Sequence, residues 1–389
     1  MARHIVAGLD IGTASIRLVV SEVVPESSSP RVLCQVKKDS RGLRRGYIIN
    51  PDETLENLKD AVKEAERQTK IKLKSVLLSI GGITLDAKVA SGQVTISRAD
   101  QEVSDADQKR ALETARASLG DFPNRQVIHQ IPLSFKLDGE KVLGQPVGLR
   151  GNKLEVKVLF IHSLSQHLND LIRVVGLAGL SVDDVVAAPL AGSFSTLSTT
   201  QKMAGVALVN IGSQTTSIIT FEEGIPLSLQ VFPFGSNDVT NDIALGLKVS
   251  LEEAEQLKLG GNQNQAVGLK KKLDEIIEAR LTDIFESVEA HLKKIGRNSL
   301  LPAGIIIVGD GGNLENIERL AKTSLRLPAR LFDPLQAPQL KTQIRDASWV
   351  VAYGLCLFGF GLVSEEPLGT TLVQTTKSSF VRWIKEFWP

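Results

Sequence analysis

Two short segments of the sequence place a glycine and a small residue directly after a run of apolar and β-branched residues. The first reads Asp10-Ile11-Gly12-Thr13-Ala14, and the second, 200 residues later, reads Asn210-Ile211-Gly212-Ser213-Gln214. A turn of this kind presents successive backbone N–H groups and a side-chain hydroxyl to one concavity, which suits the oxygens of a phosphate group. Two such turns facing each other would bind a polyphosphate from both sides.

Asp10 stands at the end of the first run and could hold the hydrated Mg²⁺ that accompanies a nucleotide. Mg²⁺ prefers one or two carboxylates together with waters and phosphates. The alternative is that both segments are ordinary hairpin turns and that Asp10 accepts hydrogen bonds from its own turn. The repeated pattern favours duplicated lobes that share a site.

A third segment could approach a flat ligand. The buried-strand pattern Ile305–Val308 runs into Gly309-Asp310-Gly311-Gly312 and then into a helix expected at Leu314–Lys322. Glycines between a strand and a helix let the backbone come close to a ligand. A dinucleotide fingerprint is the competing interpretation, but Leu314 stands where its third glycine belongs.

Apolar runs of strand length alternate with segments of helical periodicity, a mixture that indicates an α/β protein. Strands are expected at Ile5–Leu9, Ile16–Val24, Val76–Ile80, Val206–Ile211, Ser217–Phe221 and Ile305–Val308. Helices are expected at Thr54–Thr69, Ser104–Ser118, Ser165–Val175, Leu251–Leu257 and Leu269–Ile295. The segment from about 82 to 160, with one helix, two strands and several Gly and Pro turns, is expected to be an inserted domain.

The composition excludes several classes of protein. With 389 residues the chain is long for one hydrophobic core, so two or more domains are expected. Its 45 Lys and Arg against 44 Asp and Glu give a net charge of +1, which does not favour a nucleic-acid partner. Cys34 and Cys356 are too few for a disulfide framework, which fits a reducing compartment. The apolar run 349–363 is shorter than the about 20 residues that span a membrane, so a buried helix and a cytoplasmic protein are expected.

The order of phosphate hairpin, second phosphate hairpin and Gly-rich turn resembles the actin/Hsp70/sugar-kinase superfamily, and within it the FtsA family of bacterial cell-division proteins. Further similar segments extend over nearly the whole chain: the basic Gly-x-x-x-Gly segment 41–46, the segments 127–132 and 146–149 of the 1C subdomain, and the segments 238–244 and 255–258. The resemblance implies an actin/Hsp70-like two-lobe fold with duplicated ribonuclease-H-like cores and an inserted, SHS2-like 1C subdomain.

The same resemblance divides the chain into segments and places a nucleotide cleft between the two lobes. The expected segments are the lobe I core (1A) at 1–81 and 161–200, the inserted 1C subdomain at 82–160, the lobe II core (2A) at 201–235 and 302–348, subdomain 2B at 236–301, a core helix at 349–363, a linker at 364–377 and an amphipathic membrane-targeting helix at 378–389.

The resemblance also implies ATP and Mg²⁺ as ligands and gives roles to particular residues. Asp10 would hold the metal through water, and no catalytic residue is assigned. The nucleotide would lie among Gly12, Thr13 and Ala14 of the first turn, Gly212, Ser213, Gln214 and Thr215 of the second turn, Glu255 and Lys258 beside the ribose, and Gly309, Asp310, Gly311 and Gly312 beside the adenine.

The sequence departs from the family pattern in the second turn. Asn210 and Ser217 stand where the family has acidic residues, and Ser213 and Gln214 replace glycines. Asp310 replaces a glycine of the adenosine turn. Because one carboxylate near the metal is lost, the protein is expected to be at most a weak ATPase.

On this resemblance the protein is an ATP-binding scaffold that assembles into filaments and links the tubulin-like division protein FtsZ to the inner face of the cell membrane. Two alternatives remain open. One is a PilM-like interaction platform for pilus assembly, which would not need a terminal membrane helix. The other is a sugar-kinase-like phosphotransferase, which would need a substrate base near the cleft that the sequence does not mark.

The last ten residues separate the first two possibilities. Five large apolar residues recur there at helical spacing and would form one stripe: Phe380, Trp383, Ile384, Phe387 and Trp388. Tryptophan favours the membrane–water interface, and the preceding stretch 364–376 has the composition of a tether. A membrane-binding helix is predicted, against the alternative of a helix that packs on the protein's own surface.

Overall fold

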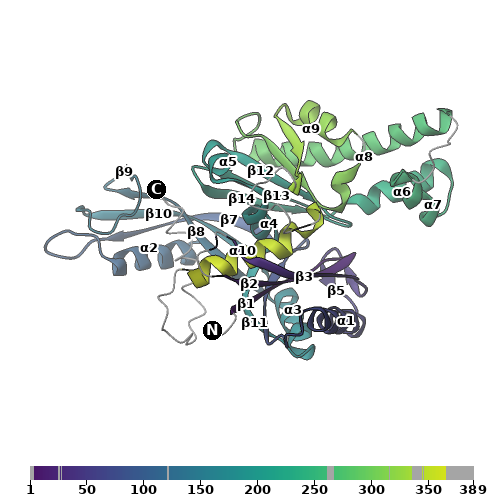
Figure 1. Cartoon of the computed structure of the whole chain (residues 1–389). Coiled ribbons are helices and arrows are strands. Elements are labelled where there is room, and N and C mark those ends of the chain that lie inside the picture. The colour runs from purple at the N-terminus through teal and green to yellow at the C-terminus, as the bar shows by residue number, and fades with distance from the viewer. Residues whose placement is uncertain are drawn as a thin grey trace.

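The computed structural model describes residues 4–24, 27, 29–120, 122–260, 267–314, 316–334, 344 and 346–364. Within them the chain forms two α/β lobes, a domain inserted in the first lobe, and a pair of helices between the lobes (Figure 1). In this part of the chain, no helix has both the length and the apolar character that a membrane crossing requires.

The first lobe is built on a five-stranded sheet. Its strands are β1 (His4–Ile11), β2 (Ser15–Val23), β3 (Arg31–Asp39), β6 (Ser75–Ile80) and β11 (Ser181–Ala187), in the order β11-β6-β1-β2-β3. The first three strands are antiparallel, and β6 and β11 continue the sheet in parallel. The helices α1 (Pro51–Thr69) and α3 (Ser165–Leu177) pack on this sheet, and a small hairpin, β4 (Leu43–Arg44) with β5 (Tyr47–Ile48), precedes α1.

The second lobe repeats this topology. Its strands are β12 (Val206–Ile211), β13 (Thr216–Glu222), β14 (Ile225–Phe232), β15 (Ile305–Val308) and β16 (Ala329–Leu331), in the order β14-β13-β12-β15-β16. Again three antiparallel strands are extended by two parallel ones. The duplication predicted from the two turns is therefore confirmed.

Helices of the second lobe cover its sheet and extend away from it (Figure 1). They are α6 (Ser236–Leu247), α7 (Leu251–Lys258), α8 (Val267–Lys294) and α9 (Ile317–Leu325). A short 3₁₀ helix, η1 (Asp310–Asn313), follows β15, so the helix expected from Leu314 begins at Ile317 instead. The glycines of this segment form a helical turn of their own, which delays the start of α9.

The inserted domain is an antiparallel sheet with one helix. It contains β7 (Asp86–Thr95), α2 (Asp105–Ala117), β8 (Arg125–Leu137), β9 (Glu140–Val142) and β10 (Lys153–Leu164), with the strand order β7-β10-β8-β9. The sheet thus has four strands, and the expectation of two was wrong. The chain enters and leaves this domain at residues 82–84 and 162–164, here called the root of the insertion.

Two helices lie between the lobes, α4 (Ala188–Thr196) and α10 (Val350–Ser364) (Figure 1). They pack so closely that a Cβ atom at Gly354 would lie 1.9 Å from Ala191 O. A Cβ atom at Gly8 in β1 would lie 2.2 Å from Ala352 O in the same way. Gly354 of the apolar run therefore permits the close packing of α10 on α4. The expected buried helix is confirmed.

Candidate functional site

The two predicted phosphate turns have the same backbone closure. In the turn between β1 and β2, Gly12 N donates to Ser15 O over 3.0 Å. In the turn between β12 and β13, Gly212 N donates to Thr215 O over 2.9 Å. The two turns are therefore equivalent in local structure as well as in their place in the duplicated topology.

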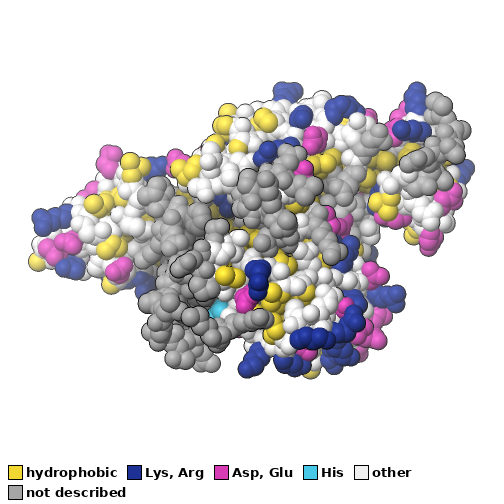
Figure 2. Space-filling model, viewed as in Figure 1, with side chains coloured by type: hydrophobic (Ala, Val, Ile, Leu, Met, Phe, Trp, Pro, Cys, Tyr) yellow, Lys and Arg dark blue, Asp and Glu magenta, His cyan; other side chains and the backbone are white. Residues whose placement is uncertain are grey.

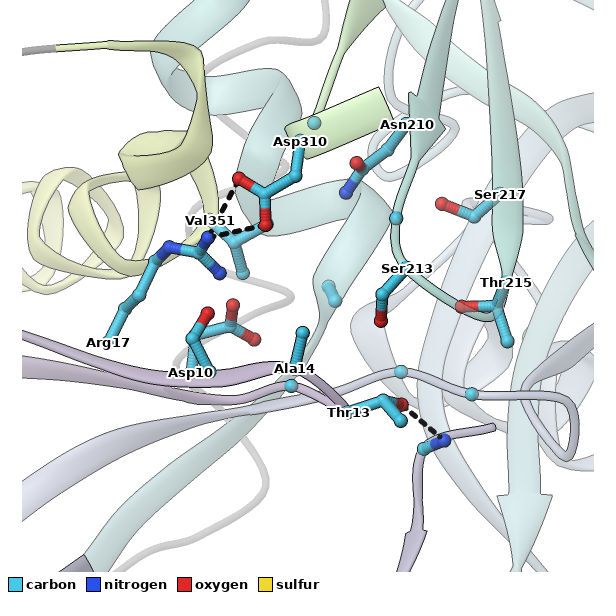
Figure 3. A pocket seen from close by; sticks show the side chains of 18 of the residues that line it. Asp10, Thr13, Ala14, Arg17, Asn210, Ser213, Thr215, Ser217, Asp310 and Val351 are labelled. Carbon is cyan, nitrogen blue, oxygen red and sulfur yellow. Dashed lines mark hydrogen bonds and ion pairs between the residues drawn. The ribbon is translucent and has the colours of Figure 1, made fainter. Parts of the chain in front are cut away.

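Both turns face one cavity between the lobes (Figure 3). The first lobe contributes Asp10, Gly12, Thr13 and Ala14, and the second contributes Asn210, Gly212, Ser213, Thr215, Ser217, Gly309 and Asp310. The volume of the cavity is about 120 Å³, below the about 300–1,000 Å³ of most small-molecule pockets. A nucleotide that binds here is therefore expected to separate the two lobes.

An ion pair crosses this cavity from one lobe to the other. Arg17 Nη2 in β2 lies 2.8 Å from Asp310 Oδ2 and 3.0 Å from Oδ1 (Figure 3). The Arg17 side chain is 8% exposed and that of Asp310 is 39% exposed. Arg17 was not singled out from the sequence, although an arginine inside a strand of apolar residues signals a buried charge with a partner.

Asp10, the predicted metal ligand, lines the cavity from the end of β1. Its Oδ1 accepts a hydrogen bond of 2.5 Å from Ser79 Oγ in β6. Burial raises the pKa of the Asp10 carboxyl, while the Ser79 hydrogen bond and the charge of Arg17 lower it and the charge of Asp310 raises it further. The carboxylate is thus costly to bury, and a cation beside it would offset that cost.

The second turn presents an amide and a hydroxyl where carboxylates were expected from the family pattern. Asn210 and Ser217 are Cα partners across β12 and β13, and both line the cavity. Gly309 packs against this turn with a φ of +96°, and a Cβ atom there would lie 2.4 Å from Asn210 Oδ1 and from Ile211 O. The predicted adenosine turn therefore contacts the second phosphate turn through a position that requires glycine.

Four predicted nucleotide residues are not among the described residues that line the cavity: Gln214, Glu255, Lys258 and Gly311. Lys258 Nζ is 2.7 Å from Glu255 Oε2, and it also donates to Ser236 O over 3.3 Å. Ser236 N in turn donates to Gly212 O over 2.9 Å. The Glu255–Lys258 pair is therefore connected to the second turn through Ser236 of α6. Gly312 lies within η1.

The predicted membrane-binding residues Phe380, Trp383, Ile384, Phe387 and Trp388 lie outside the described residues, as does all of the predicted linker except Ser364. Within the described chain, no cluster of three or more His, Cys, Asp or Glu side chains is arranged to hold a metal ion. A metal at Asp10 would therefore need most of its ligands from water and phosphate.

Two family models match the chain. One, described as "Cell division protein FtsA", matches residues 207–354, and the other, "SHS2 domain inserted in FTSA", matches residues 83–162. The chain is similar to the cell division protein FtsA of Borreliella burgdorferi, with 30% identity over 92% of this chain and 91% of the relative. It is 29% identical to that of Pseudomonas aeruginosa over 91% of this chain and 89% of the relative.

Solved structures with the same fold include the PilM–PilN type IV pilus biogenesis complex, with a TM-score of 0.68 and 18% identity over 93% of this chain and 99% of that chain. MreB5 of Spiroplasma citri bound to ADP has a TM-score of 0.50 and 12% identity over 93% of this chain and 99% of that chain. At these identities the similarity establishes an actin-like fold and no more.

Proposed function

Because this chain belongs to the FtsA family of cell division proteins, we propose that its cleft binds ATP with Mg²⁺ and that the bound nucleotide supports assembly into filaments. The filaments would lie on the membrane through the amphipathic segment 378–389 and would anchor the tubulin-like division protein FtsZ there. The protein would thus act as a scaffold on the cytoplasmic face of the cell membrane.

The observation that carries the nucleotide proposal is the pair of equivalent turns on one cavity. Gly12 and Gly212 close their turns with the same hydrogen bond, at matching positions of two lobes with the same strand order. Such turns suit phosphate oxygens, and two of them suit a polyphosphate. A protein of the same fold, MreB5 of Spiroplasma citri, is bound to ADP, which supports the choice of an adenine nucleotide.

The residues around Asp10 fit a Mg²⁺ ion that arrives with the nucleotide. Ser79 donates a hydrogen bond to Oδ1 of the carboxylate and so orients it. Water and phosphate would supply the remaining oxygen ligands of the ion. The ion would neutralise phosphate charge in a cavity where Arg17 is already paired with Asp310. Asp10 would orient the hydrated ion between the two turns.

Substitution of Arg17 and substitution of Asp310, the two partners of the ion pair across the cavity, should change ATP affinity in opposite directions. Arg17→Ala is expected to weaken ATP binding about tenfold to hundredfold, since it removes a charged hydrogen-bond donor and leaves Asp310 unpaired. Asp310→Asn is expected to tighten binding about threefold or more, because it frees Arg17 for a phosphate. Titration of each variant with Mg²⁺ and ATP provides the measurement. If Asp310→Asn weakened binding instead, Asp310 would itself be a nucleotide ligand.

ATP hydrolysis should be slower than about one turnover per second, a low rate for an enzyme. Asn210 offers a neutral amide where a carboxylate would help to organise metal and water, so Asn210→Asp should raise the rate about tenfold or more. Phosphate release at saturating ATP and Mg²⁺ measures this. Asn169→Asp, which makes the same change on the exposed face of α3, should leave the rate unaltered. Equal rates in wild-type protein and Asn210→Asp would contradict the role given to this position.

The two alternatives receive less support. The PilM–PilN structure is similar only at the level of the fold, at 18% identity. A phosphotransferase would need a base for its substrate, and of the described acidic residues that line the cavity, Asp310 is paired with Arg17 and Asp10 with Ser79. Sedimentation with and without ATP, combined with flotation on vesicles, separates a filament-forming membrane scaffold from both alternatives.

A further inference from the structure

The basic segment 41–46 includes the first strand and the tip of the hairpin 43–48, and this tip lies beside the nucleotide cavity. β4 pairs with β5, and Arg45 and Gly46 are the two residues of the connecting turn. Both have positive φ angles, +51° for Arg45 and +85° for Gly46, as a type I′ turn requires. A Cβ atom at Gly46 would lie 2.5 Å from Gly82 Cα. The tip therefore packs directly against the root of the insertion.

The two N–H groups of this tip hold the two phosphate turns. Gly46 N donates to Thr13 Oγ1 over 2.9 Å (Figure 3), and Arg45 N donates to Gln214 Oε1 over 2.9 Å. Because the Thr13 oxygen accepts from Gly46, its own hydroxyl proton remains for another acceptor on the cavity side. A phosphate oxygen there would attract the Thr13 hydroxyl and change the bond that Thr13 makes with the tip.

The two carbonyl groups of the same tip hold the root and α3. Ile83 N donates to Arg45 O over 3.2 Å, and His167 Nε2 lies 2.8 Å from Gly46 O. One peptide group therefore links the root directly to the first turn, since Arg45 O and Gly46 N belong to the same peptide. Hydrogen bonds on both ends of a peptide polarise and strengthen each other.

His167 extends this chain of hydrogen bonds into the root, and the donor and the acceptor of each bond can be assigned. The carbonyl of Gly46 can only accept, so Nε2 of His167 donates to it. Burial lowers the pKa of His167, so the ring is neutral and Nδ1 accepts from Thr84 Oγ1, 2.7 Å away. Thr84 must then accept from Ser163 Oγ, 2.6 Å away. Thr84 and Ser163 belong to the two chain crossings of the root.

We propose that the tip formed by Arg45 and Gly46, with His167 as a positioning residue, transmits nucleotide occupancy of the cleft to the root of the inserted domain. This inference rests on the proposed binding of ATP between the two turns. The four backbone polar groups of the tip each bond to a different part: the first turn, the second turn, the root and α3. Separation of the turns by a nucleotide therefore cannot occur without a change at the tip, and the tip is bonded to the root.

Hydrogen exchange of the full chain with and without saturating Mg²⁺ and ATP tests this coupling. In wild-type protein, ATP should change the exchange rate of root amides by about threefold to tenfold, the range expected for a hydrogen bond of ordinary net strength. His167→Phe keeps a ring for the stack on Tyr47, at a centroid distance of 4.7 Å, but cannot bond to Gly46 or Thr84. It should bind ATP within about threefold of wild type. It should lose the part of the response that runs through Thr84 and Ser163, while the bond from Ile83 N to Arg45 O remains.

Two further variants test whether the effect is due to the hydrogen bonds of His167. His167→Gln retains a donor for Gly46 O and should restore part of the response. His291→Phe is the matched control, because His291 is also buried and bonded to a serine, Ser228 Oγ at 3.0 Å, but lies in α8. It should leave the response intact. A full response at Thr84 and Ser163 in His167→Phe overturns the role given to His167. Wild-type protein that binds ATP without any change at the root overturns the coupling as a whole and leaves the proposed function standing. Wild-type protein that binds no ATP overturns both.

Discussion

Replacing Asp10 with asparagine is expected to weaken the binding of ATP in the presence of Mg²⁺ by about tenfold or more, and to raise the melting temperature of the ligand-free protein. The amide keeps an oxygen that can accept the hydrogen bond from Ser79 Oγ, so the local structure is retained. The neutral amide cannot form an ion pair with the metal cation. Binding of ATP without Mg²⁺ should not weaken, because no ligand of the nucleotide itself is removed.

The gain in stability follows from the raised pKa of Asp10. Burial raises this pKa above its ordinary value, so the folded state binds the proton more tightly than the unfolded state does. The contribution of Asp10 to stability is therefore favourable below its ordinary pKa and is lost as the pH rises through the folded-state pKa. At neutral pH the buried carboxylate opposes folding, and asparagine removes that effect. The rise in melting temperature that Asp10→Asn causes should thus be larger at pH 7 than at about pH 4.

Asp184 in β11 provides the matched control. Burial raises the pKa of Asp184 as well, and its Oδ1 accepts a bond from Val185 N that asparagine can retain. Asp184→Asn should stabilise the protein without altering Mg²⁺-dependent ATP binding. Scanning fluorimetry gives the melting temperatures and titration calorimetry gives the affinities. If Asp10→Asn bound ATP with an unchanged dependence on Mg²⁺, the metal would not lie at Asp10.

Removal of residues 378–389 is expected to release the protein from anionic vesicles while ATP binding stays unchanged. The stripe at Phe380, Trp383, Ile384, Phe387 and Trp388 would be the apolar face of an interfacial helix. A short helix of this kind binds reversibly and modestly on its own, and neighbouring copies in a filament multiply the affinity. Deletion should therefore reduce the vesicle-bound fraction about tenfold or more under conditions of assembly.

Single substitutions distinguish the stripe from the overall charge of the segment. Trp383→Glu places a charge in the stripe and should act nearly as strongly as the deletion. Ser378→Glu adds the same charge on the opposite face of the expected helix and should leave most of the binding intact. Flotation of each variant with vesicles measures the bound fraction. A deleted protein that still floats with the vesicles would place the membrane contact elsewhere in the chain.

Much of the fold could be predicted from local patterns. The runs before Gly12 and Gly212 are strands that turn back on themselves, and their similarity at a distance of 200 residues indicated the duplication that β1–β2 and β12–β13 show. The strands of the insertion were harder to predict. β9 has only three residues, Glu140–Val142, and β7 is largely exposed, so neither carries a clear alternation of apolar and polar residues.

The contacts that shape the site could not be predicted in the same way. Arg17 and Asp310 are 293 residues apart in the sequence, and their pairing depends on how the two lobes meet. The hydrogen bond from Arg45 N to Gln214 crosses 169 residues. Neither pair can be recognised from the spacing of apolar and polar residues, because that spacing reflects only the element in which each residue lies and not its distant partner. Space-filling colours show the surface around the lobes as a mixture of acidic and basic side chains (Figure 2), so the surface charge in this view does not point to the cleft either.

Titration calorimetry of ATP with Mg²⁺ into the unaltered full chain tests the central claim, that the two turns form a nucleotide site, most directly. The predicted result is a saturable heat with one ATP per chain and a dissociation constant below about 1 mM, accompanied by a rise in melting temperature. No heat and no thermal shift at millimolar ATP would contradict it, and would mean that this member of the family keeps the fold without the ligand.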